Sequence, residues 1–340
     1  MRKLFTILIV TFFTANIVSA QQIILSNDTT LCGSFNDTLY ALSSSASGVV
    51  ADDTHGPVVD IGFTFNFYGN PYTQLVISGN GYLTFDLTQA NQGSPWNINT
   101  AIPNPGSMPE NAILAPWQDI HSGLGGSITY STAGIAPNRV FVVTWCAIPM
   151  YSCNNLLHTS QVVLHEGTDK IEMFLQDKPL CSTFNSGAAI QGLVDIASAN
   201  VDIVIDPATG SDRNYPLQWT AINEGWQFIP NGGSTYLIDT IPYVPIVAGE
   251  TTWEDINGNV LGVGATLYLD TNITTTIFAS VSGVCNFGNF IDSVIITIPA
   301  CFDLGLSSVS ASCFGDDAEI TCQPDTLLPT WQCELCRVVD

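Results

Sequence analysis

The chain has 340 residues, of which seven are basic and thirty are acidic, so its formal net charge is −23. Such an acidic surface repels phosphate backbones and anionic lipid, which argues against nucleic acid as a partner. The length is enough for two or three domains with cores of their own. No segment after the N-terminus has the roughly 20 apolar residues that a spanning helix needs.

The first twenty residues have the three parts of a cleavable signal peptide. Arg2 and Lys3 are basic, an apolar run follows over residues 4–13, and Ser19 and Ala20 are small. This order predicts export with cleavage after Ala20, and an N-terminal membrane anchor is the alternative. Both basic residues leave with the peptide, so five basic and thirty acidic residues give the mature chain a net charge of −25.

The mature sequence is typical of an all-β fold. Helical periodicity is nearly absent, and short runs of Val, Ile, Thr, Phe and Tyr are bounded by Gly, Asn, Pro and Ser. Residues 61–67 alternate apolar with small or polar side chains and predict a half-buried strand. Strands at 75–78 and 82–85 flank a turn cluster at 79–81.

The pattern predicts three parts after the signal peptide over residues 1–20. Residues 21–240 are expected to form a β-sandwich domain. Residues 241–300 begin with a Pro-rich connector, contain a turn at Asn257–Asn259, and predict a smaller sandwich. Residues 301–340 are rich in Cys but too short to bury a core alone, so we expect a truncated or partial repeat.

A predicted hairpin with its turn at Gly167–Asp169 points to one disulfide. If Glu166 pairs near Lys170, the numbers of paired residues sum to about 336 in a simple antiparallel register. Cys153 and Cys181 sum to 334, so they meet at the open end of the hairpin and are predicted to be bonded.

All ten cysteines lie in the mature part, and an even number in an exported chain predicts disulfides. Once Cys153 and Cys181 pair, Cys32 and Cys146 remain as the second pair of the first domain. Cys285 and Cys301 bracket the last strand of the second domain. They pair with each other, or Cys301 belongs to the segment that follows.

Three segments in a fixed order resemble the nidogen-type extracellular β domain. They are Ile-Gly-Phe-Thr-Phe-Asn-Phe-Tyr-Gly at 61–69, the Asn-Gly turn and its flanking strands at 75–85, and Ala-Ile-Leu-Ala-Pro-Trp-Gln-Asp-Ile at 112–120. The resemblance covers about residues 55–240 and is closest to the N-terminal module of large surface proteins of Bacteroidetes. It implies a β domain that works outside the cell.

Two later segments resemble other surface modules. Residues 252–259, Thr-Trp-Glu-Asp-Ile-Asn-Gly-Asn, are similar to an immunoglobulin-like domain of bacterial surface proteins. Residues 310–317, Ser-Ala-Ser-Cys-Phe-Gly-Asp-Asp, resemble the start of the SprB-type repeat of gliding-motility adhesins, without its usual continuation. Such proteins often end in an anchoring domain, so the resemblance implies attachment to the outer cell surface through a further C-terminal region.

Carboxylates are the best candidates for a chemical site. No Gly-x-Ser-x-Gly elbow, His-Glu-x-x-His motif or P-loop is present, so we expect no enzyme. Asp52, Asp53 and Asp60 lie around a loop before the first strong strand, and Asp119 precedes a Gly-rich segment. Either group offers the oxygen ligands that Ca²⁺ prefers, and calcium is the one cofactor that we consider. The alternative is that the acidic residues only keep the protein soluble.

The candidate binding residues are Trp96, Trp117 and Asp119. Trp96 is expected in a loop, and together with Trp117, Trp219 and Trp226 it could stack on glycans, although tryptophans of a sandwich more often pack in the core. The sequence thus predicts a secreted or cell-surface adhesion protein for glycan or another extracellular surface. Two alternatives stay open: a secreted carbohydrate-active hydrolase with paired carboxylates, and a structural spacer.

Overall fold

The protein is described by a computed structural model that covers residues 22–49, 51–107, 109–282, 285, 289–299, 307–308 and 320–321. Over these residues the fold is all-β, as predicted, and the helical elements are three 3₁₀ turns: η1 (Leu87–Gln89), η2 (Ser122–Leu124) and η3 (Asn185–Gly187). None of these helices could cross a membrane. The predicted signal peptide and most of the predicted partial repeat lie outside the described residues, apart from a short ladder between β23 (Ser307–Ser308) and β24 (Ile320–Thr321).

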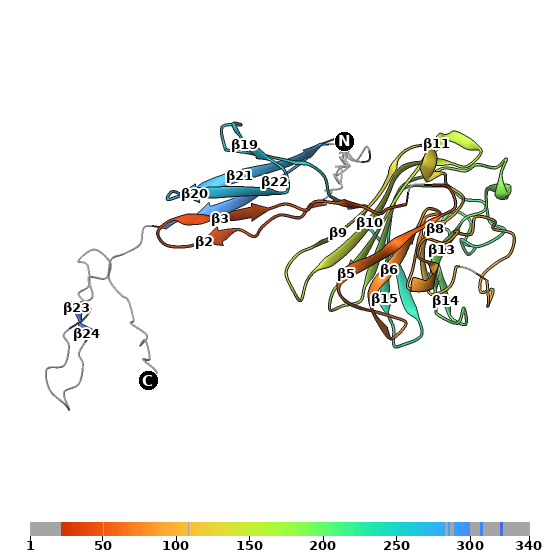
Figure 1. The fold of residues 1–340 in the computed structure, drawn as a ribbon. Helices are drawn as coiled ribbons and strands as arrows, with labels where there is room; N and C mark the ends of the chain where they lie inside the picture. The colour runs from red at the N-terminus through yellow and green to blue at the C-terminus, as the bar shows by residue number, and fades with distance from the viewer. Residues whose placement is uncertain are drawn as a thin grey trace, which may run out of the picture.

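Two β units follow one another in space (Figure 1), and the larger is a sandwich of two antiparallel sheets. One sheet has seven strands in the order β16 (Tyr236–Ile241), β15 (Ala221–Pro230), β12 (Ile171–Lys178), β11 (Cys153–His165), β10 (Val140–Met150), β9 (Ser127–Ala133) and β4 (Ser45–Ala46). The other has six, in the order β14 (Val201–Ile203), β13 (Ile190–Val194), β8 (Ala112–Trp117), β7 (Tyr82–Thr84), β6 (Asn70–Ser78) and β5 (His55–Phe67). The predicted β-sandwich is thus confirmed.

Strand β5 illustrates how the sequence builds this core. Ile61, Phe63, Phe65 and Phe67 are at most 5% exposed, whereas the residues between them face solvent. This period of two is what a strand with one buried face requires. The buried residues pack in one cluster with Trp145 of the facing sheet. Each fully buried aromatic side chain of this kind contributes roughly 1.5–3 kcal/mol to stability.

The predicted turn at residues 79–81 joins β6 to β7 and fixes the position of a buried polar residue. Gly81 has a φ of +79°, and an added Cβ would lie 2.2 Å from the carbonyl oxygen of Pro116. Only glycine fits such a close approach in this backbone conformation. Asn80 is therefore fully buried against the segment that follows β8. There the backbone carbonyl of Asn80 accepts a hydrogen bond from the backbone N–H of Gln118.

Strands β11 and β12 form the predicted hairpin. Leu164 lies opposite Ile171, so paired residue numbers sum to 335, one less than predicted, until a bulge near Thr159 shifts the register. The structure contains the disulfide between Cys153 and Cys181, with their Cα atoms 5.8 Å apart. The hairpin register and the disulfide together place the loops before β11 and after β12 next to each other.

The smaller unit has a five-stranded sheet in the order β19 (Val260–Val263), β18 (Thr251–Glu254), β21 (Thr275–Ser282), β22 (Asn289–Thr297) and β2 (Thr29–Thr30), and a ladder of β20 (Thr266–Thr271) with β3 (Phe35–Tyr40). Leu39, Trp253, Ile277 and Val294 form its core. The predicted Asn257–Asn259 turn joins β18 to β19. The immunoglobulin-like assignment of this unit stays a prediction.

The N-terminal strands differ from their predicted place. The sequence analysis assigned everything from residue 21 to residue 240 to one sandwich, but β2 pairs with β22 and β3 pairs with β20 of the smaller unit. Strand periodicity does not tell which distant strand a short segment joins, because any exposed sheet edge offers the same backbone groups. The larger sandwich is therefore inserted between two segments of the smaller unit.

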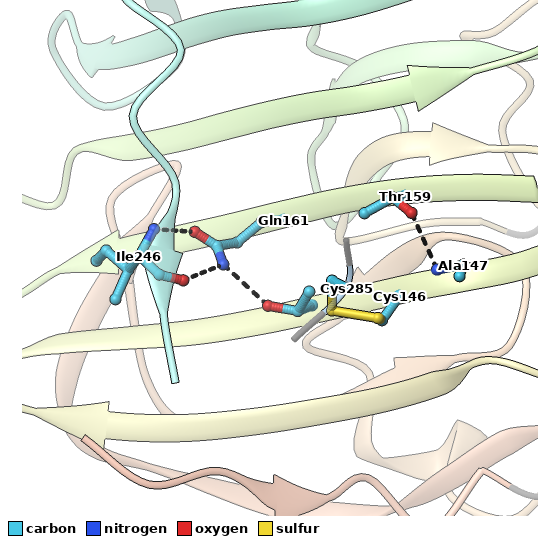
Figure 2. Close-up of a disulfide and its surroundings, with 7 residues drawn as sticks. Cys146, Ala147, Thr159, Gln161, Ile246 and Cys285 are labelled. Atoms are coloured by element: carbon cyan, nitrogen blue, oxygen red, sulfur yellow. Dashed lines mark hydrogen bonds between the residues drawn. A yellow bond between two sulfur atoms is a disulfide. The ribbon is translucent and has the colours of Figure 1, made fainter. Parts of the chain in front are cut away.

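The N-terminal strand pairs with the connector that leads from the larger unit back to the smaller one, between β16 and β18. Strand β1 (Gln22–Ile23) forms a parallel ladder with β17 (Ile246–Val247). Gln161 of β11 is 1% exposed, and its amide accepts from the Ile246 N–H and donates to the Ile246 carbonyl, each at 2.8 Å (Figure 2). The side chain thus completes the backbone hydrogen bonding of the connector, which an exposed, flexible linker would leave to water.

A disulfide between Cys146 of β10 and Cys285 crosses the same junction (Figure 2), with Cα atoms 5.0 Å apart. Both cysteines belong to a buried cluster with Ile23, Val247 and Val281. The cluster draws on both units, on the N-terminal strand β1 and on β17 of the connector. The junction is therefore a small core closed by a covalent bond.

This disulfide corrects two predicted pairs. Cys146 does not pair with Cys32, and Cys285 does not pair with Cys301, because Cys146 and Cys285 bond each other. Cys32 lies in the loop between β2 and β3, which is part of the smaller unit, and Cys301 lies outside the described residues. The prediction failed because it paired cysteines within presumed domains, whereas this disulfide joins two of them.

Candidate binding face

Three carboxylates from two loops meet at one edge of the larger sandwich. Asp52 and Asp53 precede β5, and Asp119 follows β8. One oxygen from each residue lies within 4.8 Å of the other two, and we name these residues the acidic cluster. Asp52 and Asp53 are partly buried, and Asp119 is only 6% exposed.

Buried Asn80 holds the two loops in this position. Its Nδ2 donates to Asp53 Oδ1 at 3.0 Å, and its Oδ1 accepts from the Ile120 N–H at 3.3 Å. A second link runs from Ser122 Oγ to the Ala51 carbonyl at 2.9 Å. Neighbouring carboxylates repel one another, so the acidic cluster does not hold itself together. The hydrogen bonds of Asn80 and Ser122 keep its two loops in place.

Burial and like charge raise the pKa values in the cluster. Burial is the main cause at Asp119, and with the charges of Asp53 and Asp52 it raises the pKa of Asp119 to about 7. Burial and then Asp53 raise the pKa of Asp52, and His121 opposes them. The Nε2 of His121 lies 3.4 Å from Asp52 Oδ2. The site therefore favours a bound proton or cation near neutral pH.

A row of rings leads away from the acidic cluster. His121 stacks on Tyr151 with ring centroids 6.0 Å apart, Tyr151 lies 4.7 Å from Phe184, and Phe184 lies 5.9 Å from Trp96. We name these four residues the aromatic ledge. Trp96 is 41% exposed and Tyr151 is 37% exposed, so the ledge offers ring surface to solvent.

The sandwich and its hairpin position this ledge. Trp117 Nε1 donates to the Pro95 carbonyl at 2.8 Å, and Asn185 Nδ2 donates to the Trp96 carbonyl at 2.7 Å. The Cys153–Cys181 disulfide brings the loops that carry Tyr151 and Phe184 together. Groups that bind ligands need such support, because a loose side chain loses entropy when it is ordered.

The predicted site residues have different outcomes. Asp52 and Asp53 lie with Asp119, which the sequence analysis treated as a separate candidate, whereas Asp60 lies outside the cluster on β5 and accepts from Gln74 Nε2 at 2.6 Å. Of the tryptophans proposed for stacking, Trp96 is exposed. The other three are buried at 4–6% exposure and belong to the core: Trp117, Trp219 and Trp226.

Sequence reasoning missed the residues that connect the two features. Asn80 was interpreted only as part of a turn, and Tyr151 and Phe184 gave no signal because single aromatic residues are common in strands and loops. The predicted Cys153–Cys181 disulfide was the available clue, since Tyr151 and Phe184 lie within three residues of it. The hydrogen bonds and the disulfide that support the exposed rings of Trp96 and Tyr151 join segments far apart in the sequence, so they are found only in the structure.

A disulfide-bonded β-sandwich fits an extracellular binding or structural domain. The sequence model of the NIDO-related family matches residues 29–236, which is more than half of the chain. The protein therefore belongs to the NIDO-related family. No curated protein and no solved structure matches the chain.

Proposed function

We propose that this protein is a non-enzymatic adhesion or binding protein of the extracellular space or cell surface, and that the aromatic ledge recognises glycans. The row of neighbouring rings formed by Trp96, Phe184 and Tyr151, of which Trp96 and Tyr151 are exposed, is the observation that carries the proposal. Family membership supports the extracellular setting, and a fold alone does not define a ligand. The glycan assignment therefore depends on the chemistry of the ledge.

That chemistry matches a sugar. A pyranose ring has an apolar face of C–H groups that packs on the face of an aromatic ring, while its hydroxyls need polar partners nearby. The ledge has polar neighbours at both ends: Asn185 beside Trp96, and the acidic cluster beside His121. An open ledge suits a chain of sugars on a surface better than a small molecule that must be enclosed.

The hydrolase alternative has less support. A retaining glycosidase holds two carboxyl groups about 5–5.5 Å apart and an inverting enzyme holds them farther apart, so that the scissile bond fits between them. The oxygens of the acidic cluster lie within 4.8 Å, and Asp119 is 6% exposed. A glycosidic bond has little access there, which favours binding without turnover.

The finer assignments belong to this proposal as well. We infer export through cleavage after Ala20 and attachment to the outer cell surface. A role beside the gliding-motility adhesins of Bacteroidetes follows from the same sequence resemblances. The smaller unit would then serve as a spacer, and its bonded junction would hold the ledge at a fixed angle to the surface.

A glycan and matrix-protein array tests the proposal. The full chain, produced under oxidising conditions, should bind a defined set of glycans without releasing cleaved products. Trp96→Ala should lower the affinity for these glycans about tenfold, because it removes one stacking surface.

Tyr268→Ala is the matched control, because Tyr268 is 62% exposed but lies on β20 of the smaller unit. It should leave binding unchanged. Equal losses in the two variants, or no retention by any glycan or matrix component, would contradict the proposed ledge. Sugar release that Asp119→Asn abolishes would favour the hydrolase instead.

A further inference from the structure

The acidic cluster has a geometry that calls for a ligand other than a sugar. Asp52, Asp53 and Asp119 each offer one oxygen, and these three oxygens lie within 4.8 Å of one another. Carboxylates this close repel strongly where water is excluded, and a cation between them converts the repulsion into attraction. Asn80 donates to Asp53 in one loop and accepts from Ile120 in the other, so its hydrogen bonds oppose separation of the two loops.

Unsatisfied oxygens provide a second observation. Asp119 is more than nine-tenths buried, and its Oδ1 is sealed from solvent with no hydrogen-bond partner in the part of the chain that the structure describes. The Oδ1 atom of Asp52, a partly buried residue, is likewise sealed from solvent and has no hydrogen-bond partner among the described residues. Buried carboxylate oxygens in native proteins are nearly always paired. Two orphaned oxygens in one cluster therefore mark the place of a missing partner.

We propose that Asp52, Asp53 and Asp119 bind one Ca²⁺ ion. The ligands are all hard oxygens, which suit Ca²⁺ or Mg²⁺, whereas Zn²⁺ prefers sulfur and imidazole nitrogen. Asp52 and Asp53 are partly exposed, so water can complete the six to eight ligands of Ca²⁺. Ca²⁺ also tolerates ligands in irregular positions from two separate loops, whereas Mg²⁺ requires a nearly ideal octahedron.

Binding of the ion would stiffen one end of the aromatic ledge. Asp119 accepts a hydrogen bond from the Tyr151 N–H through its carbonyl, and Asp52 lies 3.4 Å from His121 Nε2. An ion that fixes Asp119 therefore also restrains the backbone of Tyr151. An ion that fixes Asp52 restrains the carboxylate beside His121. The calcium site does not depend on the glycan proposal, because metal binding is measured on the protein alone.

Isothermal titration calorimetry tests the site. The full chain is stripped with chelator and titrated with CaCl₂ and, separately, with MgCl₂. We expect one Ca²⁺ per chain, with an affinity at least about tenfold above that for Mg²⁺. Asp119→Asn and Asp53→Asn should each weaken Ca²⁺ binding by at least about tenfold, because each removes one charged ligand. Asp60→Asn, an exposed aspartate outside the cluster, should bind like the unchanged protein.

Thermal unfolding in chelator separates lost binding from lost folding. Asp119→Asn relieves charge repulsion, so without metal it should melt at or above the temperature of the unchanged protein, and it should lose the calcium-induced rise. Asp52→Asn, at a more exposed position, provides a second variant if Asp119→Asn does not fold. Undiminished Ca²⁺ binding in the folded variants, equal affinity for Mg²⁺, or no binding at all would overturn the proposal.

Discussion

The Asp119 carboxyl makes stability depend on pH in an unusual direction. Its pKa in the folded protein is about 7, above the ordinary value of 3.8, because of burial first and the neighbouring aspartates second. Between these two values the folded state holds a proton that the unfolded state has released. The contribution of Asp119 to stability is therefore present at low pH and is lost as the pH rises from about 4 to 7.

Urea unfolding in chelator measures this effect. A shift of this size corresponds to a loss of up to about 4 kcal/mol across the window. Asp119→Asn should flatten this part of the pH profile, and Asp60→Asn should not. A profile that is the same in both variants would mean that Asp119 has an ordinary pKa in the folded protein.

At the scale of single residues, the sequence predicted ligand chemistry better than ligand geometry. It selected Asp52, Asp53 and, as a separate candidate, Asp119 because carboxylates offer the oxygen ligands that hard cations prefer. It grouped Asp60 with the first two because of proximity along the chain, but Asp60 lies on a strand that leads away from the loop. Asn80, which joins the loops, could not be found without knowing that β7 and β8 are neighbours.

The junction between the units is the element that most determines the shape of the molecule. Cys146 and Cys285 are separated by 139 residues, so their bond closes a very long loop and restricts the unfolded chain strongly. The double variant Cys146→Ser with Cys285→Ser should lower the free energy of unfolding by roughly 2–5 kcal/mol. Calorimetry should then show two transitions where the unchanged protein is expected to show one, because the units lose the disulfide that couples their unfolding.

Cys153→Ser with Cys181→Ser is the matched control for this experiment. It removes a bond within the larger sandwich, with a sequence separation of 28, and should lower stability without separating the two transitions. If the Cys146–Cys285 double variant still unfolds in one transition with unchanged stability, the disulfide does not couple the units.

At the scale of elements, local patterns were reliable and long-range pairing was not. The alternation in β5, the turns at 79–81 and 257–259 and the β11–β12 hairpin could be predicted because neighbouring residues determine them. The pairing of β2 with β22 and the Cys146–Cys285 bond join segments more than a hundred residues apart. No local signal specifies such partners, because the choice depends on how the whole core packs.

The whole molecule combines a NIDO-related sandwich with a second β unit that is built from both sides of it in sequence. The Cys146–Cys285 disulfide and the buried cluster around it join the two units, so force applied to one unit is transmitted to the other by covalent and buried contacts. The acidic cluster and the aromatic ledge lie together on the larger sandwich. This arrangement suits a protein that presents one binding face on a stiff support.

Hydrogen–deuterium exchange tests the location of that face most directly. The full chain is compared alone and with a saturating amount of the glycan that binds it best on the array. The ledge predicts slower exchange in three segments that carry it, residues 93–97, 150–154 and 181–186, and unchanged exchange in the smaller unit. Protection confined to the smaller unit, or to a different edge of the sandwich, would contradict recognition by the aromatic ledge.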